Sequence, residues 1–137
     1  MIYFFYEFFF KINLDKNSLK KLIFNVVKYE GYKIGNINII FCNDNYLLNI
    51  NLKFLKKNNY TDVIAFEIIK KKNIYGDIYI SLERILYNSK KFQENFFHEL
   101  KRVIIHAILH FIGYKDKYKK EKKIMYNKEN LLLNLFS

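Results

Sequence analysis

The sequence predicts an α+β fold in which a small mixed β-sheet packs against helices, and a buried central helix carries two histidines. Segments rich in β-branched and aromatic residues alternate with segments of helical apolar spacing along the whole chain. Residues 103–112 are apolar on every side apart from these histidines, as in a helix buried at the centre of a fold. Because 137 residues contain no repeat and no linker, we expect one domain spanning residues 1–137.

Strands are predicted where β-branched and aromatic residues cluster between turn-forming residues. The first is almost wholly apolar, so we expect it to be buried on both faces of the sheet. A basic connection, residues 70–73, separates the last two strands, and Gly76 leads into the final one. The predicted strands are residues 2–10, 36–41, 61–68 and 77–81.

Helices are predicted where a capping side chain precedes apolar residues at helical spacing. Asn17 and Ser18 offer a cap for a first helix that Gly31 closes, and Ser81 offers one for a short third helix. The second helix follows the polar residues 43–45 and ends by 56–59. The central helix begins at Asn95, and after a lysine-rich segment a last helix carries apolar residues from 124 to 136.

Composition restricts the environment and the class of partner. The single Cys42 excludes an internal disulfide and fits a reducing compartment, so we expect a cytoplasmic protein. The apolar runs are too short to span a bilayer, so we expect no membrane partner. A net charge of +11 favours a polyanion such as RNA or DNA. Heavy use of Lys, Asn, Ile, Tyr and Phe without proline also fits A/T-rich codons, so charge alone leaves nucleic-acid binding open.

The most informative motif is a pair of histidines, His106 and His110, inside the apolar run. Four residues make one helical turn, so both imidazoles leave the same face. Gly113 is a helix stop, after which the chain can turn and bring Asp116 back toward the rings. Two nitrogens and a carboxylate with one open position form a catalytic zinc site. We therefore expect His106, His110 and Asp116 to hold one zinc ion, although a single histidine in an apolar helix is more often a hydrogen-bonded core residue.

Other kinds of zinc site fit the sequence less well. A helical zinc protease has glutamate directly after the first histidine as its general base, whereas this chain has Ala107. A structural site needs a fourth protein ligand, and the candidates Cys42 and His98 are distant in sequence. An open position for water is the simpler interpretation. Two imidazoles and one carboxylate would leave about +1 on the site, which makes the metal a weaker Lewis acid than a three-histidine site.

These motifs resemble the signature of the YbeY family, the bacterial endoribonucleases and rRNA maturation factors. The family pattern His-Gly-x-Leu-His-Leu-x-Gly-Tyr-Asp-His is similar to residues 106–116, with Asp116 in place of the third histidine. Residues 61–66 are similar to Thr-Asx-Val-Leu-Ser-Phe, and residues 76–81 match Gly-Asp-Ile-x-Ile-Ser. Met125 and Glu129 stand where the family has a methionine and an acidic residue.

The resemblance implies a zinc-dependent, single-strand-specific endoribonuclease. Its substrate would be ribosomal RNA of the small subunit, in 3′ end maturation and ribosome quality control, with His106, His110 and Asp116 as catalytic metal ligands. The family also has an arginine that corresponds here to Leu55, so a phosphate-binding guanidinium is missing at that position. The residues we expect to bind substrate are Lys53, Lys56, Lys57, Lys115, Lys117 and Asp62.

Two alternative functions remain open, and three carboxylates have roles that the sequence only partly defines. A non-catalytic ribosome-assembly factor, with zinc stabilising its fold, would explain the missing arginine; a metallopeptidase is disfavoured by Ala107. Asp62 either acts near the metal or caps a turn, whereas Asp77 is expected to be structural. Glu99 lies two helical turns before His106, so we expect it to support the site rather than bind the metal.

Overall fold

The computed structural model describes residues 1–10 and 12–137 and contains one four-stranded sheet and five helices within them. The strand order is β1-β2-β4-β3. β1, β2 and β4 are parallel, and β3 runs antiparallel beside β4, so the predicted α+β fold with a mixed sheet is confirmed. The elements are β1 (Ile2–Tyr6), α1 (Lys16–Tyr29), β2 (Lys33–Cys42), α2 (Asp44–Leu55), β3 (Val63–Lys70), β4 (Asn73–Ser81), α3 (Leu82–Lys91), α4 (Phe96–Phe111) and α5 (Lys119–Phe136).

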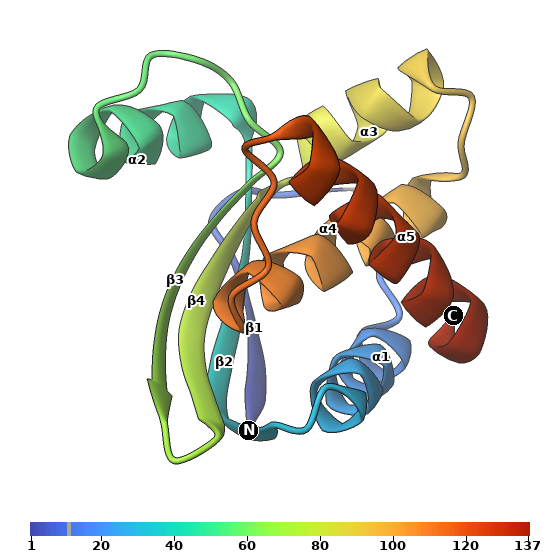
Figure 1. The fold of residues 1–137 in the computed structure, drawn as a ribbon. Helices are drawn as coiled ribbons and strands as arrows, with labels where there is room; N and C mark the ends of the chain where they lie inside the picture. Colours follow the sequence, from blue (N-terminus) through green and yellow to red (C-terminus); the bar gives the residue numbers. More distant parts are fainter. Residues whose placement is uncertain (11) are drawn as a thin grey trace.

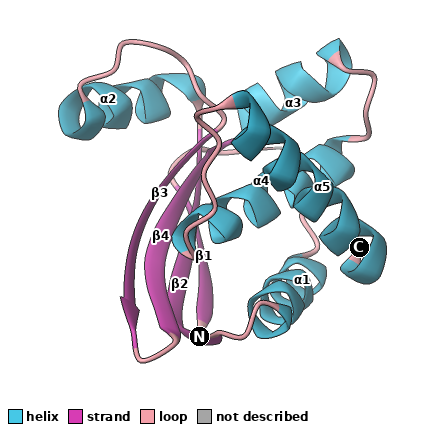
Figure 2. Cartoon of the chain, in the orientation of Figure 1, coloured by secondary structure: helices cyan, strands magenta, loops and turns pink. Residues whose placement is uncertain are grey.

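The helices divide unequally between the two sides of the sheet. α1, α4 and α5 lie on one side, and α2 lies beyond the other, near the ends of β2 and β3 (Figure 1). The main core forms between the sheet and the helices α1, α3, α4 and α5, with α4 nearest the strands (Figure 2). A smaller cluster, centred on Cys42, Leu47 and Ile64, fills the space under α2. The functional motif of α4 therefore lies in the larger core, at its boundary with β3.

The first strand differs from the prediction. β1 ends at Tyr6, and it is an edge strand that pairs only with β2. Tyr3 and Phe5 point away from the helices and remain exposed, while Ile2 and Phe4 pack on the main core. The expectation of burial on both faces was wrong because only one face of β1 packs on the core, and apolar composition does not reveal whether one or both faces of a strand are covered.

The basic connection between the last two strands is also shorter than predicted. β3 and β4 form a hairpin whose two-residue turn is Lys71–Lys72, with φ of 50° and 68°. Positive φ at both central residues is the geometry of a tight hairpin turn, which usually contains glycine or asparagine. Gly76 consequently lies inside β4, three residues after its start, rather than before it.

Most helix boundaries agree with the predicted caps. Asn43, Ser81 and Asn95 each accept a hydrogen bond from the first turn of the helix that follows. The first helix is the exception, because Asp15 rather than Asn17 or Ser18 is its cap and accepts from the Ser18 amide at 3.1 Å. The lysine-rich segment forms the first turns of α5 rather than a separate connection.

α4 approaches the sheet closely at its C-terminal end, where Gly76 of β4 meets Phe111. A Cβ atom at Gly76 would lie 2.8 Å from the Phe111 ring and 2.7 Å from the Phe66 carbonyl oxygen. Residues 103–105, 107–109 and 111 are all buried, as the apolar run predicted. This contact positions the last turn of the helix, which carries the second histidine of the motif. None of the helices in the described part of the chain has the length and apolarity needed to cross a lipid bilayer.

Candidate metal centre

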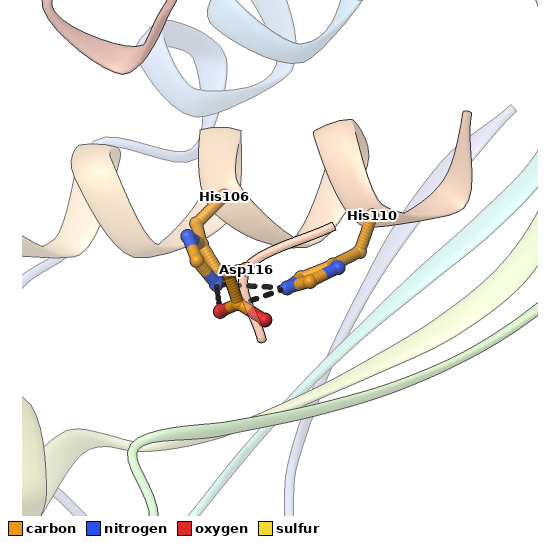
Figure 3. A group of neighbouring side chains, drawn as sticks. All are labelled: His106, His110 and Asp116. Carbon is orange, nitrogen blue, oxygen red and sulfur yellow. Dashed lines mark hydrogen bonds and ion pairs between the residues drawn. The ribbon is translucent and has the colours of Figure 1, made fainter. Parts of the chain in front are cut away.

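His106 and His110 lie one turn apart on α4 and point toward the same spot (Figure 3). Their ring centroids are 4.6 Å apart, and the two Nε2 atoms are 3.0 Å apart. Both rings are partly exposed, unlike the apolar residues around them. The helix therefore presents two nitrogen donors at the surface of the main core.

The end of α4 directs the chain back toward these rings. Gly113 has φ of 104°, and its amide donates to the His110 carbonyl at 3.1 Å. The Tyr114 amide donates to the Leu109 carbonyl at 3.0 Å, which completes a glycine-terminated helix end. Asp116 then reaches both imidazoles, with its Oδ2 3.2 Å from His106 Nε2 and 3.3 Å from His110 Nε2.

The three donor atoms form a nearly equilateral triangle with sides of 3.0, 3.2 and 3.3 Å. Tetrahedral zinc with bonds of about 2.0–2.2 Å separates its ligand atoms by about 3.3–3.5 Å, so the spacing fits. His106, His110 and Asp116 are the members of this group within residues 1–10 and 12–137, and they could hold a metal ion. Three protein donors leave room for a further ligand from solvent or substrate.

The far side of His106 is held by Glu129 of α5. His106 Nδ1 lies 2.6 Å from Glu129 Oε2, and the buried carboxylate also accepts from Arg102 Nη1 at 3.0 Å. An ionised carboxylate only accepts hydrogen bonds, so the imidazole proton belongs on Nδ1 and the Nε2 lone pair faces the site. A carboxylate behind a histidine ligand orients the ring and increases its basicity.

Glu129 is a position shared with the family pattern, but no motif connects it to His106, and Arg102 belongs to none of the predicted site residues. Helical spacing in the sequence could have identified Arg102, because it lies four residues before His106 and therefore on the same face of α4. No local sequence pattern could have predicted the contact of Glu129 with His106, because that contact depends on how α5 packs across α4.

The charge around His106 favours its protonated form when no cation is bound. Burial by itself lowers the pKa of this imidazole, but the hydrogen bond and negative charge of Glu129, with the charges of Asp116 and Asp62, raise it above its ordinary value. Three carboxylates therefore create negative potential at the imidazoles. The same potential attracts a cation, which competes with protons for the Nε2 lone pair.

A cleft of about 500 Å³ opens in front of the three donor atoms. Its other wall is formed by β3 and the residues just before it, where Glu67 and Asp62 contribute carboxylates. Burial raises the pKa of Asp62, against the opposing effects of His106, backbone amides and Arg84. Glu67 was not predicted, although alternation along β3 places it on the same side as Val63 and Ala65.

The lysines that we expected to bind substrate lie outside the lining of this cleft. Lys53 is on the exposed side of α2, and Lys56 and Lys57 follow the end of that helix. Lys115 and Lys117 flank Asp116 and are exposed. Of the residues predicted to bind substrate, Asp62 is the one that lines this cleft.

The remaining candidate residues separate into supporting and distant groups. Glu99 and Asp62 line a small cavity behind His106, and burial together with the Asp62 charge raises the pKa of Glu99. Asp77 accepts from the Asn38 side chain at 2.9 Å, in agreement with the structural role expected for it. Cys42 belongs to the cluster under α2, and His98 lies outside the group of three donors.

Known proteins resemble this chain over nearly its whole length. The family model for endoribonuclease YbeY matches residues 9–137. An endoribonuclease YbeY from Karelsulcia muelleri is 53% identical over 133 residues, which cover 97% of this chain and 94% of that protein. Another from Flavobacterium psychrophilum is 45% identical over 136 residues, covering 99% of this chain and 96% of that protein.

The fold is also found in a solved structure. The solution structure of a Thermotoga maritima protein superposes with a TM-score of 0.68 and 27% sequence identity, covering 98% of this chain and 87% of that one. The match of the family model over nearly the whole chain and the high identity to full-length relatives lead to one conclusion. This chain belongs to the endoribonuclease YbeY family, whose members are nucleases that act on RNA.

Proposed function

We propose that this protein is a zinc-dependent endoribonuclease that cleaves single-stranded ribosomal RNA. Maturation of the 3′ end of small-subunit RNA and ribosome quality control in the cytoplasm are the proposed setting. The observation that carries the proposal is the triangle of donor atoms from His106, His110 and Asp116, which opens into a cleft large enough for part of a nucleotide. Family membership supplies the reaction class.

Zinc fits these donors better than a hard cation such as magnesium. Two imidazole nitrogens and one carboxylate oxygen suit zinc, whereas magnesium favours oxygen ligands in octahedral geometry. Zinc in such a site supplies Lewis acidity, which polarises a phosphodiester and makes hydroxide available from water near neutral pH. We propose one zinc ion per chain.

The chain's own residues would orient and tune this site. Glu129 holds the His106 ring with its Nε2 lone pair toward the cleft, and Arg102 holds Glu129. Asp62 and Glu67, on the opposite wall, are the carboxylates placed to accept a proton or to orient water beside the substrate. Positive charge for the RNA backbone would come from the exposed lysines at the rim.

A non-catalytic assembly factor is the second candidate, and Leu55 favours it. This exposed residue ends α2, where the resemblance leads us to expect a phosphate-binding arginine. The metallopeptidase alternative lacks support, because the methyl group of Ala107 lines the cleft at the position of that reaction's general base.

One experiment separates the first two candidates. Zinc-loaded protein is incubated with single-stranded rRNA fragments with and without chelator, beside the variants His110→Ala and His98→Ala. His98 is the matched control, because it is on α4 but outside the donor group. We expect chelator and His110→Ala to abolish cleavage and bound zinc, while His98→Ala retains both. RNA binding without cleavage by every protein would support the assembly factor.

A further inference from the structure

Outside the metal centre, an exposed arginine–tyrosine cluster formed by Tyr60, Arg84 and Tyr87 lies beside the cleft. The Arg84 Cζ atom is 5.0 Å from the Tyr60 ring centroid and 4.8 Å from that of Tyr87. Such distances bring a cation against the electron-rich faces of both rings. Arg84 is one of only two arginines among the 24 lysines and arginines of the chain, so this position has arginine although lysine is used almost everywhere else.

Arg84 is fixed from behind by Asp44 of α2. Its Nη2 donates to Asp44 Oδ2 at 2.9 Å and its Nε to Oδ1 at 3.4 Å, and Oδ1 also accepts from Ser81 Oγ at 2.7 Å. A planar guanidinium held through two of its nitrogens has little rotational freedom left. The two tyrosine rings consequently rest on a rigid support rather than on a mobile side chain.

Both rings nevertheless remain open to solvent. Tyr60 is 52% exposed and Tyr87 is 54% exposed. Contact with the guanidinium covers only part of each ring, and neither residue belongs to a buried cluster. Rigid, exposed aromatic surfaces with a cation beneath them are surfaces on which unpaired nucleobases stack, with little dependence on sequence.

The cluster is close to the metal centre through the loop between α2 and β3. Tyr60 directly precedes Thr61 and Asp62, which both line the cleft. Consecutive Cα atoms are about 3.8 Å apart, so the Cα atoms of Tyr60 and Asp62 are separated by at most about 7.6 Å. The buried Asn51 side chain donates to the Asn59 carbonyl at 2.9 Å and anchors this loop.

The same loop carries positive charge for a phosphate backbone. Lys56 and Lys57 are exposed between α2 and Tyr60. Single-strand binding sites combine a basic track for phosphates with aromatic side chains for bases. Along the chain, this loop therefore carries lysines for phosphates and then an aromatic side chain for a base, and it leads into the cleft.

We propose that Tyr60 and Tyr87, supported by Arg84, form a stacking platform for unpaired bases of RNA that enters the metal cleft. The inference rests on the proposed function and adds a base-binding subsite to it. The subsite prefers unpaired strands, because bases in a duplex do not present their faces. Arg84 is a positioning residue here, since its guanidinium acts through the two rings.

Binding of zinc-loaded protein to a fluorescently labelled single-stranded RNA of ten nucleotides tests the platform, with the intact RNA checked on a gel after each titration. We expect Tyr60→Ala and Tyr87→Ala each to weaken binding on the order of 10-fold. Tyr60→Phe keeps the ring and should retain most of the affinity. Tyr29→Ala is the matched control, because Tyr29 of α1 is similarly exposed and also lies beside a cation, with Lys128 Nζ of α5 at 5.2 Å from its ring centroid, but is not among the residues that line the cleft. Circular dichroism verifies that each variant is folded.

A second arm replaces single nucleotides of the RNA with abasic sites, using the wild-type protein. An abasic site at one position of the RNA should weaken binding by the wild type as much as Tyr60→Ala weakens binding of the intact RNA. The Tyr60→Ala variant should then bind this abasic RNA no more weakly than it binds the intact RNA. Equal binding of the alanine variants and the wild type, or equal binding of every abasic RNA, would overturn the platform while leaving the proposed function intact. Failure of the wild type to bind or cleave any single-stranded RNA would instead overturn the proposed function, and the platform with it.

Discussion

His106 and Glu129 are joined by a 2.6 Å hydrogen bond, although 23 residues separate them in sequence. This bond crosses from α4 to α5 and fixes the imidazole that provides one corner of the donor triangle. The orientation of the metal centre therefore depends on the packing of the last helix. Removal of either partner tests that dependence.

Glu129→Gln should weaken metal binding without displacing the ligands. A glutamine can still accept from His106 Nδ1. It removes, however, the negative charge that makes the imidazole a stronger metal ligand, and it leaves Arg102 without its anionic partner. Loss of such a supporting carboxylate typically costs 10–100-fold in metal affinity, and we expect about that increase in the zinc dissociation constant. Competition with a fluorescent chelator measures it. Glu121→Gln on the same helix is the control and should bind zinc as the wild type does.

Asp116→His should retain zinc and move the activity to lower pH. Three neutral imidazoles leave about +2 on the site, where the present ligand set leaves about +1. The greater positive charge stabilises hydroxide over water, so the acid limb of the cleavage rate should shift down the pH scale. Asp116→Ala, by contrast, leaves only the two histidines, and the protein should lose most of its bound zinc. An unchanged pH profile for Asp116→His, with zinc present, would show that the third ligand does not influence the reaction.

Gly76→Ala should destabilise the fold and disturb the site. The added Cβ would meet the Phe111 ring at 2.8 Å and a backbone oxygen at 2.7 Å, so the end of α4 must shift away from β4. Overpacking of this kind costs about 1–3 kcal/mol, which thermal or urea unfolding can measure.

Gly31→Ala provides the comparison for Gly76. Its Cβ would meet nothing within 4 Å, although φ of 83° strains any side chain there. This variant should lose stability through backbone strain and keep the metal affinity of the wild type. Equal metal affinity for both glycine variants would contradict a role of the Gly76 contact in positioning the motif.

Cys42 should remain unreactive in the folded protein and lower its stability at alkaline pH. Burial, with smaller effects from Asp44 and Glu7, raises the pKa of this thiol to about 12. Between a typical unfolded value near 9 and that folded value, only the unfolded state loses the proton, so stability falls as pH rises through this window. At pH 10 the loss is about 1.4 kcal/mol relative to pH 7.

The Cys42→Ala variant isolates this effect, because lysine and tyrosine titrations are common to both proteins. Urea unfolding at pH 7 and pH 10 should show a steeper decline for the wild type than for the variant. Alkylation with iodoacetamide at pH 8 should be fast only after unfolding. Rapid alkylation of the native protein would contradict the burial of the thiol under α2.

Local signals in the sequence predicted most helices and their starts. Asn43, Ser81 and Asn95 act within one helical turn, so their capping role can be recognised without the rest of the fold. The strands were harder, because the apolar segment at the start of the chain fits either a central or an edge strand. Its place at the edge depends on pairing with β2 alone, a long-range relationship.

The sequence by itself determined the core of the candidate site. Histidines four residues apart, followed by a glycine and then Asp116, lie within eleven residues, and helix geometry with one left-handed turn is sufficient to bring them together. Tertiary structure decided everything that surrounds them. Glu129, Glu67 and the arginine–tyrosine cluster belong to other segments of the chain. Only the packing of α5, β3 and α3 around α4 brings these side chains to the cleft or to its rim. The reason is that contacts between distant segments follow from burial of the shared core rather than from local geometry.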